Sequence, residues 1–286
     1  MNRKAILIGS PGTPYLSGVE MDIKNMKNFL ISANGGSWKD KIEIIELPSF
    51  DPNYSDVEKH LNNLISCDFA FVYYSGHGFT DRFGNVRVNI NSSETPLVSD
   101  FANRCKRQIT IIDACRGYSE YFSADAGISG LGEISFDNTY PDDARSIFNS
   151  YLNNCKEGRV LMYASQKWQN ATENLDGSGG YFSTNLLSAI KRIVNNTDKP
   201  VINIHDAFKP AYDLTKDIQQ PEIRITDAVA WKLPFAVKSR IHLKRNLPQA
   251  QNGITIEDVA KVAVGTVVVV GIVALIANLL GDVKKK

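Results

Sequence analysis

Residues Phe69–Gly78 read FAFVYYSGHG, and this segment carries the clearest structural signal in the chain. Its opening residues, FAFVYY, are apolar throughout, which is typical of a parallel strand buried on both faces of a sheet. A second apolar run, Ile109–Ile112, is followed in the same way by the polar segment DACRG at 113–117. The carboxyl ends of parallel strands meet at one edge of the sheet, where functional loops gather. The sequence therefore predicts that two neighbouring strands bring His77 and Cys115 to the same edge.

Strand-like and helix-like segments alternate on both sides of this stretch. The strands are short apolar runs, and the helices carry apolar residues at helical spacing. This alternation predicts an α/β fold with a mostly parallel sheet and helices on both faces. Three polar stretches interrupt it, at 79–98 (with a hairpin turn expected at Phe83–Asn85), 118–140 and 166–180. The other expected strands are Lys4–Ile8, Ile42–Leu47 and Val160–Tyr163, and the expected helices are Gly18–Ala33, Tyr54–Ile65, Asp142–Cys155 and Phe182–Val194.

Composition excludes several classes of protein. The 286 residues carry 32 Lys and Arg against 31 Asp and Glu, whereas a dedicated nucleic-acid binder usually has a large basic excess. The four cysteines include no CxxC pair, so neither a zinc site nor a disulfide framework is indicated. The N-terminal apolar run is too short for a signal peptide, so we expect the large domain to lie in the reducing cytosol.

The last thirty residues differ from the rest of the chain, because they contain a long uncharged segment. Val262–Leu280 contains nineteen residues without a charge, which as a helix would cover about 28 Å, close to the hydrocarbon thickness of a bilayer. A buried strand is the alternative, because Val267–Val270 is β-branched, but nineteen residues are far longer than an ordinary strand. We therefore predict a single C-terminal transmembrane helix.

The domain boundaries follow from this segment. We expect an α/β domain over 1–237, a linker over 238–254, a helix over 255–281 with its membrane span at 262–280, and a basic tail over 282–286. The three terminal lysines favour the cytoplasmic side of a membrane. The tail is too short to decide the orientation, so we keep the large domain cytoplasmic, as in a tail-anchored protein.

The predicted positions of His77 and Cys115, at the ends of neighbouring strands, suit a hydrolase that uses a cysteine nucleophile. That chemistry needs a thiol nucleophile, an imidazole that manages its proton, and N–H donors for the oxyanion. The backbone amides of Gly78 and Cys115 are the natural oxyanion donors. A lone histidine or cysteine at a strand end is more often structural, and it is the combination that favours catalysis.

At this point the residues resemble the caspase superfamily, which includes metacaspases and paracaspases. SGHG and DACRG resemble its catalytic histidine and cysteine motifs, and the likeness runs in order over roughly residues 3–235. It implies a caspase-like fold and peptide-bond cleavage, with Cys115 as nucleophile and His77 as general base and acid. The other segments that carry the resemblance are LSGVEMD at 16–22, YASQ at 163–166 with Gln169, Ala171 and Glu173 behind it, GYFS at 180–183, and Gln220-Pro221.

The resemblance also bears on specificity. Caspases that cut after Asp use arginines, but Leu16 stands at one of those positions and Lys167 is the only basic candidate in the substrate loop. Metacaspases and paracaspases use acids instead, and Asp22 and Asp113 match those positions. Two carboxylates favour a guanidinium or ammonium group, so we expect cleavage after Arg or Lys. An acid that only anchors a loop or lies on a helix surface is the alternative for Asp22.

Four further residues are expected near the substrate. Ser75 lines the pocket or fixes the histidine loop, Ser165 and Gln166 belong to the substrate loop, and Trp168 forms an aromatic wall of the groove. No cofactor or metal site is expected. Calcium activation stays open, because Asp81, Asp137, Asp142 and Asp143 offer oxygen ligands, although no spacing resembles an EF-hand loop.

The sequence thus predicts a membrane-anchored cysteine endopeptidase acting on protein substrates. A regulated role in cell death or defence is implied by the family resemblance alone. Two alternatives stay open: a catalytically silent interaction module at a membrane, and an effector whose released tail perturbs the membrane. Nucleic acid is not expected as a partner, and oligomerisation is left open.

Overall fold

The computed structural model describes residues 1–47, 50–118, 126–127, 133–174, 178–226 and 228–238. The expected linker, C-terminal helix and basic tail lie outside these residues. No helix within the described residues is long and apolar enough to cross a bilayer. The membrane span at 262–280 therefore stays a prediction.

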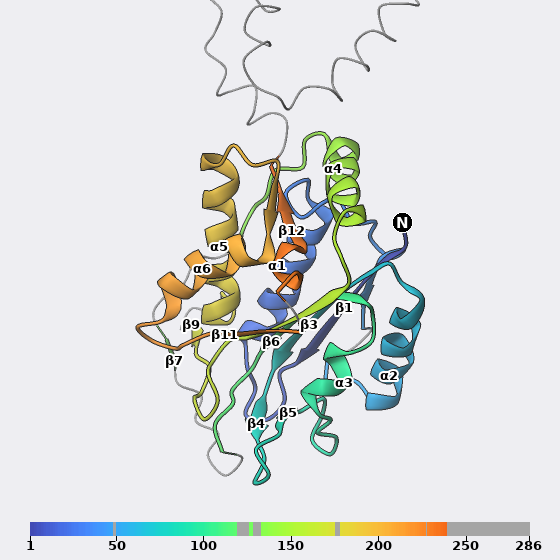
Figure 1. Cartoon of the computed structure of the whole chain (residues 1–286). Coiled ribbons are helices and arrows are strands. Elements are labelled where there is room, and N and C mark those ends of the chain that lie inside the picture. The colour runs from blue at the N-terminus through green and yellow to red at the C-terminus, as the bar shows by residue number, and fades with distance from the viewer. Residues whose placement is uncertain (48–49, 119–125, 128–132, 175–177, 227, 239–286) are drawn as a thin grey trace, which may run out of the picture. The chain divides into compact units, whose positions relative to one another are not determined.

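A six-stranded sheet forms the centre of the fold, in the order β11-β8-β6-β3-β1-β2 (Figure 1). Its strands pair in parallel, except that β11 runs antiparallel to β8 at one edge. The predicted mostly parallel sheet is confirmed. The strands are β1 (Arg3–Ser10), β2 (Ile44–Glu46), β3 (Phe69–Gly76), β6 (Arg107–Asp113), β8 (Gly158–Tyr163) and β11 (Glu222–Ile225).

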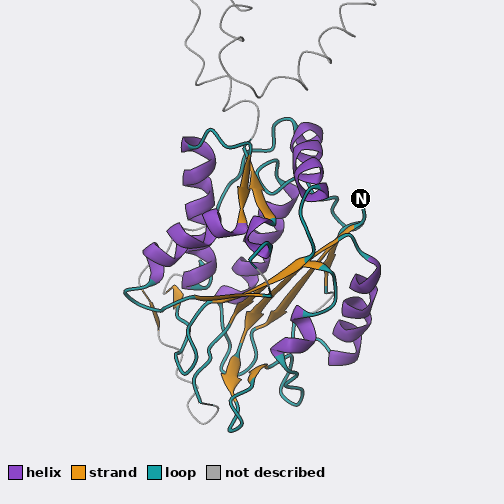
Figure 2. Ribbon diagram, in the orientation of Figure 1, coloured by secondary structure: helices purple, strands orange, loops and turns teal. Residues whose placement is uncertain are grey.

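Helices cover both faces of this sheet, as predicted (Figure 2). One face is covered by α2 (Tyr54–Asn62), which continues into the short 3-10 helix η1 (Asn63–Ser66), and by α3 (Val98–Ala102). The other face is covered by α1 (Gly18–Ile31), α4 (Pro141–Asn153), α5 (Tyr181–Asn196) and α6 (Ile204–Thr215).

Two hydrophobic cores explain why the central strands are apolar throughout. Successive side chains of a strand point to opposite faces of the sheet. In β3, Phe71 and Tyr73 pack in the core under α1 and α5, whereas Val72 and Tyr74 pack in the core under α2 and α3. Every residue of β3 is buried. The unbroken apolar run of this strand is therefore a consequence of burial on both faces.

Short elements complete the fold. A hairpin of β4 (Gly78–Thr80) and β5 (Val86–Val88) follows His77, and the turn expected at Phe83–Asn85 is present, with Gly84 at a φ of 82°. The sequence predicted neither α3 nor the small strands, because elements of two to five residues show little periodicity. The remaining elements are β7 (Ala126–Gly127), which pairs with β9 (Glu173–Asn174), β10 (Val201–Asn203), which pairs with β12 (Pro234–Val237), and the 3-10 helix η2 (Ala230–Lys232).

Candidate active site

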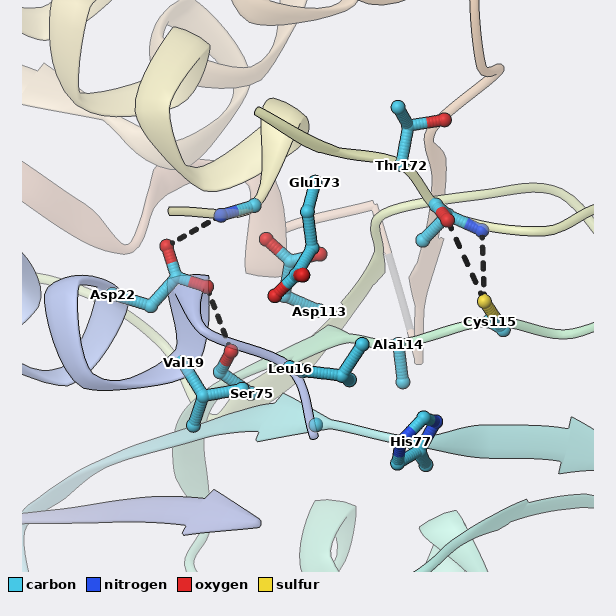
Figure 3. Close-up of a pocket in the computed structure, with 13 residues that line it drawn as sticks. Leu16, Val19, Asp22, Ser75, His77, Asp113, Ala114, Cys115, Thr172 and Glu173 are labelled. Atoms are coloured by element: carbon cyan, nitrogen blue, oxygen red, sulfur yellow. Dashed lines mark hydrogen bonds between the residues drawn. The ribbon is translucent and has the colours of Figure 1, made fainter. Parts of the chain in front are cut away.

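The strand register brings His77 and Cys115 to one edge of the sheet. β3 and β6 are parallel neighbours, and Ser75 pairs with Asp113 at their carboxyl ends. Each strand therefore delivers its next residues to the same place, and His77 and Cys115 line one pocket (Figure 3). The residues that line this pocket are Leu16, Val19, Asp22, Ser75, Gly76, His77, Asp113, Ala114, Cys115, Ala171, Thr172, Glu173 and Gly180.

The loop between β1 and α1 fixes the imidazole of His77, which is 5% exposed. Its Nε2 lies 2.6 Å from the carbonyl oxygen of Pro14. A carbonyl only accepts hydrogen bonds, so Nε2 carries the hydrogen and Nδ1 is the basic nitrogen. Gly12 makes room for the ring: its φ is 56°, and a Cβ on it would lie 2.7 Å from Cδ2 of His77. No residue type in the sequence marks Pro14, because the group that contacts the imidazole is a backbone carbonyl.

The thiol of Cys115 contacts the loop after β8. The N–H of Ala171 donates to Sγ at 3.3 Å, and the thiol donates to the carbonyl oxygen of Ala171 at 3.5 Å. Gly78, the first residue of β4, lies against the turn that carries the thiol, since a Cβ on it would lie 2.9 Å from the carbonyl oxygen of Cys115. The two predicted oxyanion donors, Gly78 and Cys115, are therefore neighbours in space.

Asp22 and Asp113 are buried together on the floor of the pocket, at 4% and 5% exposure. Asp22 accepts hydrogen bonds from Ser75 Oγ at 2.7 Å and from the N–H of Gly180 at 2.9 Å (Figure 3). Burial, and then the charge of Asp113, raise the pKa of Asp22 well above its usual range. Asp22 thus faces the pocket and also anchors a loop, and its contact with a cationic P1 residue stays a prediction.

Asp113 is held by the start of α5. Its Oδ2 accepts from the N–H of Ser183 at 3.1 Å and from Ser183 Oγ at 2.5 Å. The hydroxyls of Tyr73 and Ser183 lie 2.8 Å apart, which extends the chain of hydrogen bonds into the core. Burial nevertheless raises the pKa of Asp113 to about 6. A Cβ on Gly180 would lie 2.5 Å from Oδ2 of Asp113, so only glycine lets the loop approach this carboxyl group.

Glu173, in β9, is a third acid in the pocket, and its role was not predicted from the sequence. Its carboxylate accepts a hydrogen bond from the N–H of Gly18 at 3.1 Å. Burial is the largest cause that raises its pKa, and Asp113 contributes in the same direction. The available signal was its place in the loop after β8, within the segment that already resembled a substrate-binding loop.

Three of the expected substrate residues do not line the pocket. Ser165 is fully buried behind the turn that carries Cys115 and donates to the carbonyl oxygen of Gln169 at 3.0 Å. Gln166 is exposed at the base of the same loop. Trp168 is 43% exposed and stacks on Tyr118. Of the expected substrate residues, only Asp22, Asp113 and Ser75 therefore line one pocket with His77 and Cys115.

Within the described residues, no group of three or more His, Cys, Asp or Glu side chains is arranged to hold a metal ion. Asp81, one of the acids considered for calcium, is engaged by Arg87 and Asn85, and Asp137 is engaged by Thr139. Calcium activation stays an untested alternative.

A thiol and an oriented imidazole at the carboxyl edge of a parallel sheet are the parts that a cysteine hydrolase requires. The model of the Caspase domain family matches residues 2–226, so the chain belongs to the caspase family of cysteine peptidases, whose members act on protein substrates. The crystal structure of caspase-1 from Spodoptera frugiperda is similar in fold, with a TM-score of 0.50 and 12% identity over 78% of this chain and 86% of that chain. Comparison with curated protein sequences gives no match.

Proposed function

We propose that the chain is a cysteine endopeptidase that cleaves proteins after Arg or Lys, with Cys115 as nucleophile and His77 as general base and acid. The observation that carries this proposal is the charge of the pocket beside the thiol. Three carboxyl groups, those of Asp22, Asp113 and Glu173, line it, and no described lining residue is Lys or Arg. An acidic P1 side chain would find like charges there, whereas a guanidinium would find complementary ones.

The hydrogen bond to Pro14 supports the catalytic assignment of His77. With Nε2–H directed at a carbonyl, Nδ1 accepts the proton of the thiol as sulfur attacks the carbonyl carbon. The thiol exchanges its contact with Ala171 for the imidazole before this step. Backbone N–H groups of Gly78 and Cys115 receive the oxyanion. The imidazolium then protonates the leaving amine as the C–N bond breaks, and water hydrolyses the acyl-enzyme.

The acidic pocket supplies P1 specificity because its carboxyl groups are buried. Buried charges interact more strongly than exposed ones, since water screens them less. A cationic P1 side chain stabilises the ionised forms of Asp22 and Asp113 and displaces the protons that burial favours. The structure thereby supports binding of Arg or Lys together with release of a proton from the pocket.

The proposal for the whole chain adds the predicted membrane span at 262–280. A peptidase held at a membrane would act on proteins near that surface, which suits a regulated effector of cell death or defence. The support for this part is the uncharged C-terminal sequence and the family, and protease protection on sealed membranes tests the orientation. Shielding of the large domain would contradict its placement in the cytoplasm.

The experiment that tests the activity is hydrolysis of matched fluorogenic peptides by the full chain in detergent. The peptides differ only at P1, where they carry Arg, Lys, citrulline or Asp, and calcium is present or absent. We expect turnover after Arg and Lys, little after citrulline, which has the shape of Arg without its charge, and none by Cys115→Ala. Turnover after Asp would refute the pocket assignment, and inactivity of the wild type under every condition would refute the proposed enzyme.

A further inference from the structure

Two exposed aromatic side chains stack beside the active site without lining its pocket. The rings of Tyr118 and Trp168 lie 4.3 Å apart at an interplanar angle of 18°. Tyr118 is 60% exposed and Trp168 is 43% exposed. We refer to this pair as the aromatic platform. A stacked pair buries only part of its apolar surface, so this platform leaves two large rings in contact with water.

The platform is attached to the nucleophile by backbone hydrogen bonds. The N–H of Trp168 donates to the carbonyl oxygen of Arg116 at 3.0 Å, and the N–H of Arg116 donates to Gln169 at 2.9 Å. On the other side, the N–H of Thr80 donates to the carbonyl oxygen of Gly117 at 2.8 Å, and Thr80 forms a parallel bridge with Tyr118. The platform is thus fixed to the residues that directly follow Cys115.

The platform and the acidic pocket lie on opposite sides of the thiol along the chain. Asp113 precedes Cys115 and faces the pocket, and in Figure 3 the chain runs from Asp113 past Ala114 to Cys115, away from Asp22. Tyr118 lies three residues further on. If P1 occupies the acidic pocket, the scissile bond lies at the thiol and the next substrate residues extend toward the platform. Three extended residues span about 10 Å, so the platform is within reach of the first three.

The backbone of Trp168 adds a second observation. Its φ is 71°, in the left-handed region that bulky residues rarely adopt and whose strain is often stored at functional sites. Exposure of the ring means that burial in the core does not offset this strain. The ammonium group of Lys167 lies 4.9 Å from the centre of the Trp168 ring, so the platform carries a positive charge on its rim. This charge disfavours a basic occupant.

We propose that Tyr118 and Trp168 form a subsite for the substrate on the C-terminal side of the scissile bond. The subsite selects a large apolar or aromatic side chain within the first three residues after the cleaved bond and rejects a basic one. This inference rests on the proposed peptidase function. It assigns Trp168 to the primed side of the substrate, where the sequence predicted only an aromatic wall of the groove.

The test compares substrates that share one sequence up to a P1 arginine. One ends in a coumarin leaving group and has no primed residues. The others are internally quenched peptides that continue for three residues, with Phe, Leu, Gly or Lys placed in turn at each position. For the full wild-type chain, we expect kcat/KM at one of these positions to be on the order of tenfold higher for Phe than for Gly, and lowest for Lys.

Three variants separate recognition from folding. Trp168→Gly removes the ring at a backbone conformation that suits glycine, so the fold is retained while the Phe-to-Gly preference falls toward one. Trp168→Phe keeps a ring and retains most of the preference. The matched control is Tyr140→Gly. Tyr140 is also exposed and left-handed, with a φ of 55°. It is the N-cap residue of α4, however, and the loop before it is hydrogen-bonded to Ala33 beyond the far end of α1. This control keeps the wild-type preference.

Three outcomes would contradict the proposed subsite or the proposed peptidase function. Cleavage of the coumarin substrate with no primed preference in the wild type would overturn this inference and leave the proposed function standing. A preference that survives Trp168→Gly would overturn it as well, because another surface would then be responsible. Failure of the wild type to cleave any Arg substrate would overturn the proposed function, and this inference with it.

Discussion

Replacing Asp113 by Asn provides a sharp test of the pocket, because stability and activity are expected to change in opposite directions. Asn has the shape of Asp, and its amide oxygen can accept the two hydrogen bonds that Ser183 donates. The substitution removes a buried charge next to Asp22, whose pKa Asp113 helps to raise. The variant therefore loses the charge that would bind a cationic P1 residue while it keeps the packing.

The expected gain in stability follows from the pKa of Asp113. Burial raises it from 3.8 to about 6, which corresponds to about 3 kcal/mol at 1.36 kcal/mol per tenfold change. Because the folded state holds this proton more tightly, it binds more protons than the unfolded state between about pH 4 and pH 6, and the free energy of unfolding falls as pH rises through that window. The full cost is present at pH 7. Asp113→Asn should therefore be more stable by about 3 kcal/mol at pH 7 and by about half as much at pH 5.

The peptidase activity of Asp113→Asn is expected to fall while its stability rises. A buried charge pair that loses one partner weakens binding by about 2–5 kcal/mol, so kcat/KM for Arg substrates should fall on the order of a hundredfold or more. The ratio of kcat/KM for the Arg substrate to kcat/KM for the citrulline substrate should approach one. In the wild type, KM for Arg substrates should fall as pH rises from 5 to 7, because the pocket acids ionise.

Urea unfolding at pH 5 and pH 7, together with the Arg and citrulline assay, measures both effects. The matched control is Asp217→Asn, which removes an exposed carboxylate and should change neither. The reasoning would be refuted if Asp113→Asn were less stable than the wild type at pH 7, or if it still cleaved Arg substrates at the wild-type rate.

Three further predictions address other parts of the chain. Ser183→Ala removes one of the hydrogen bonds to Asp113, so KM for Arg substrates at pH 7 should rise on the order of tenfold and the pH dependence of KM should shift to higher pH. Ser183→Thr should restore both, and an unchanged pH profile in Ser183→Ala would contradict this reasoning. Gly12→Ala places a Cβ 2.7 Å from the His77 ring, so kcat should fall on the order of tenfold or more. Its control is Gly84→Ala: Gly84 is also left-handed, at the hairpin turn, and this variant should keep the wild-type kcat on the coumarin substrate. Equal losses of kcat in both variants would point to backbone strain rather than to displacement of the imidazole. The full chain should float with lipid vesicles and residues 1–250 should not, and co-flotation of both would assign membrane binding to another surface.

The placement of His77 and Cys115 could be predicted because it depends on a strong pattern. β3 and β6 are buried on both faces, so their apolar runs stand out, and parallel pairing alone carries their following residues to one edge. The helices α1, α2, α4 and α5 were predictable for a similar reason, since each has one apolar face. The short strands and α3 lack such periodicity, and they are positioned by tertiary contacts.

The residues that contact His77 and the pocket acids were not predictable in the same way. Pro14 acts through its carbonyl oxygen, which every residue possesses, so no residue type marks the position. Ser183 and Glu173 act only because α5 and the loop after β8 fold against β6, and that proximity is a property of the assembled sheet. Trp168 has the right chemistry for a substrate contact, but its backbone conformation and its stacking on Tyr118 cannot be derived from its spacing.

The energetics of the pocket argue for a cationic ligand independently of the family. Asp22 and Asp113 are buried side by side, burial raises the pKa of both, and burial also raises that of Glu173. Such a group of acids destabilises the folded state at neutral pH, because unpaired buried charges lose their hydration. No described Lys or Arg lines the pocket to offset this cost. A cation supplied by a substrate would offset it, so the same cost of burial that is expected to make Asp113→Asn more stable would supply binding energy for an Arg or Lys side chain.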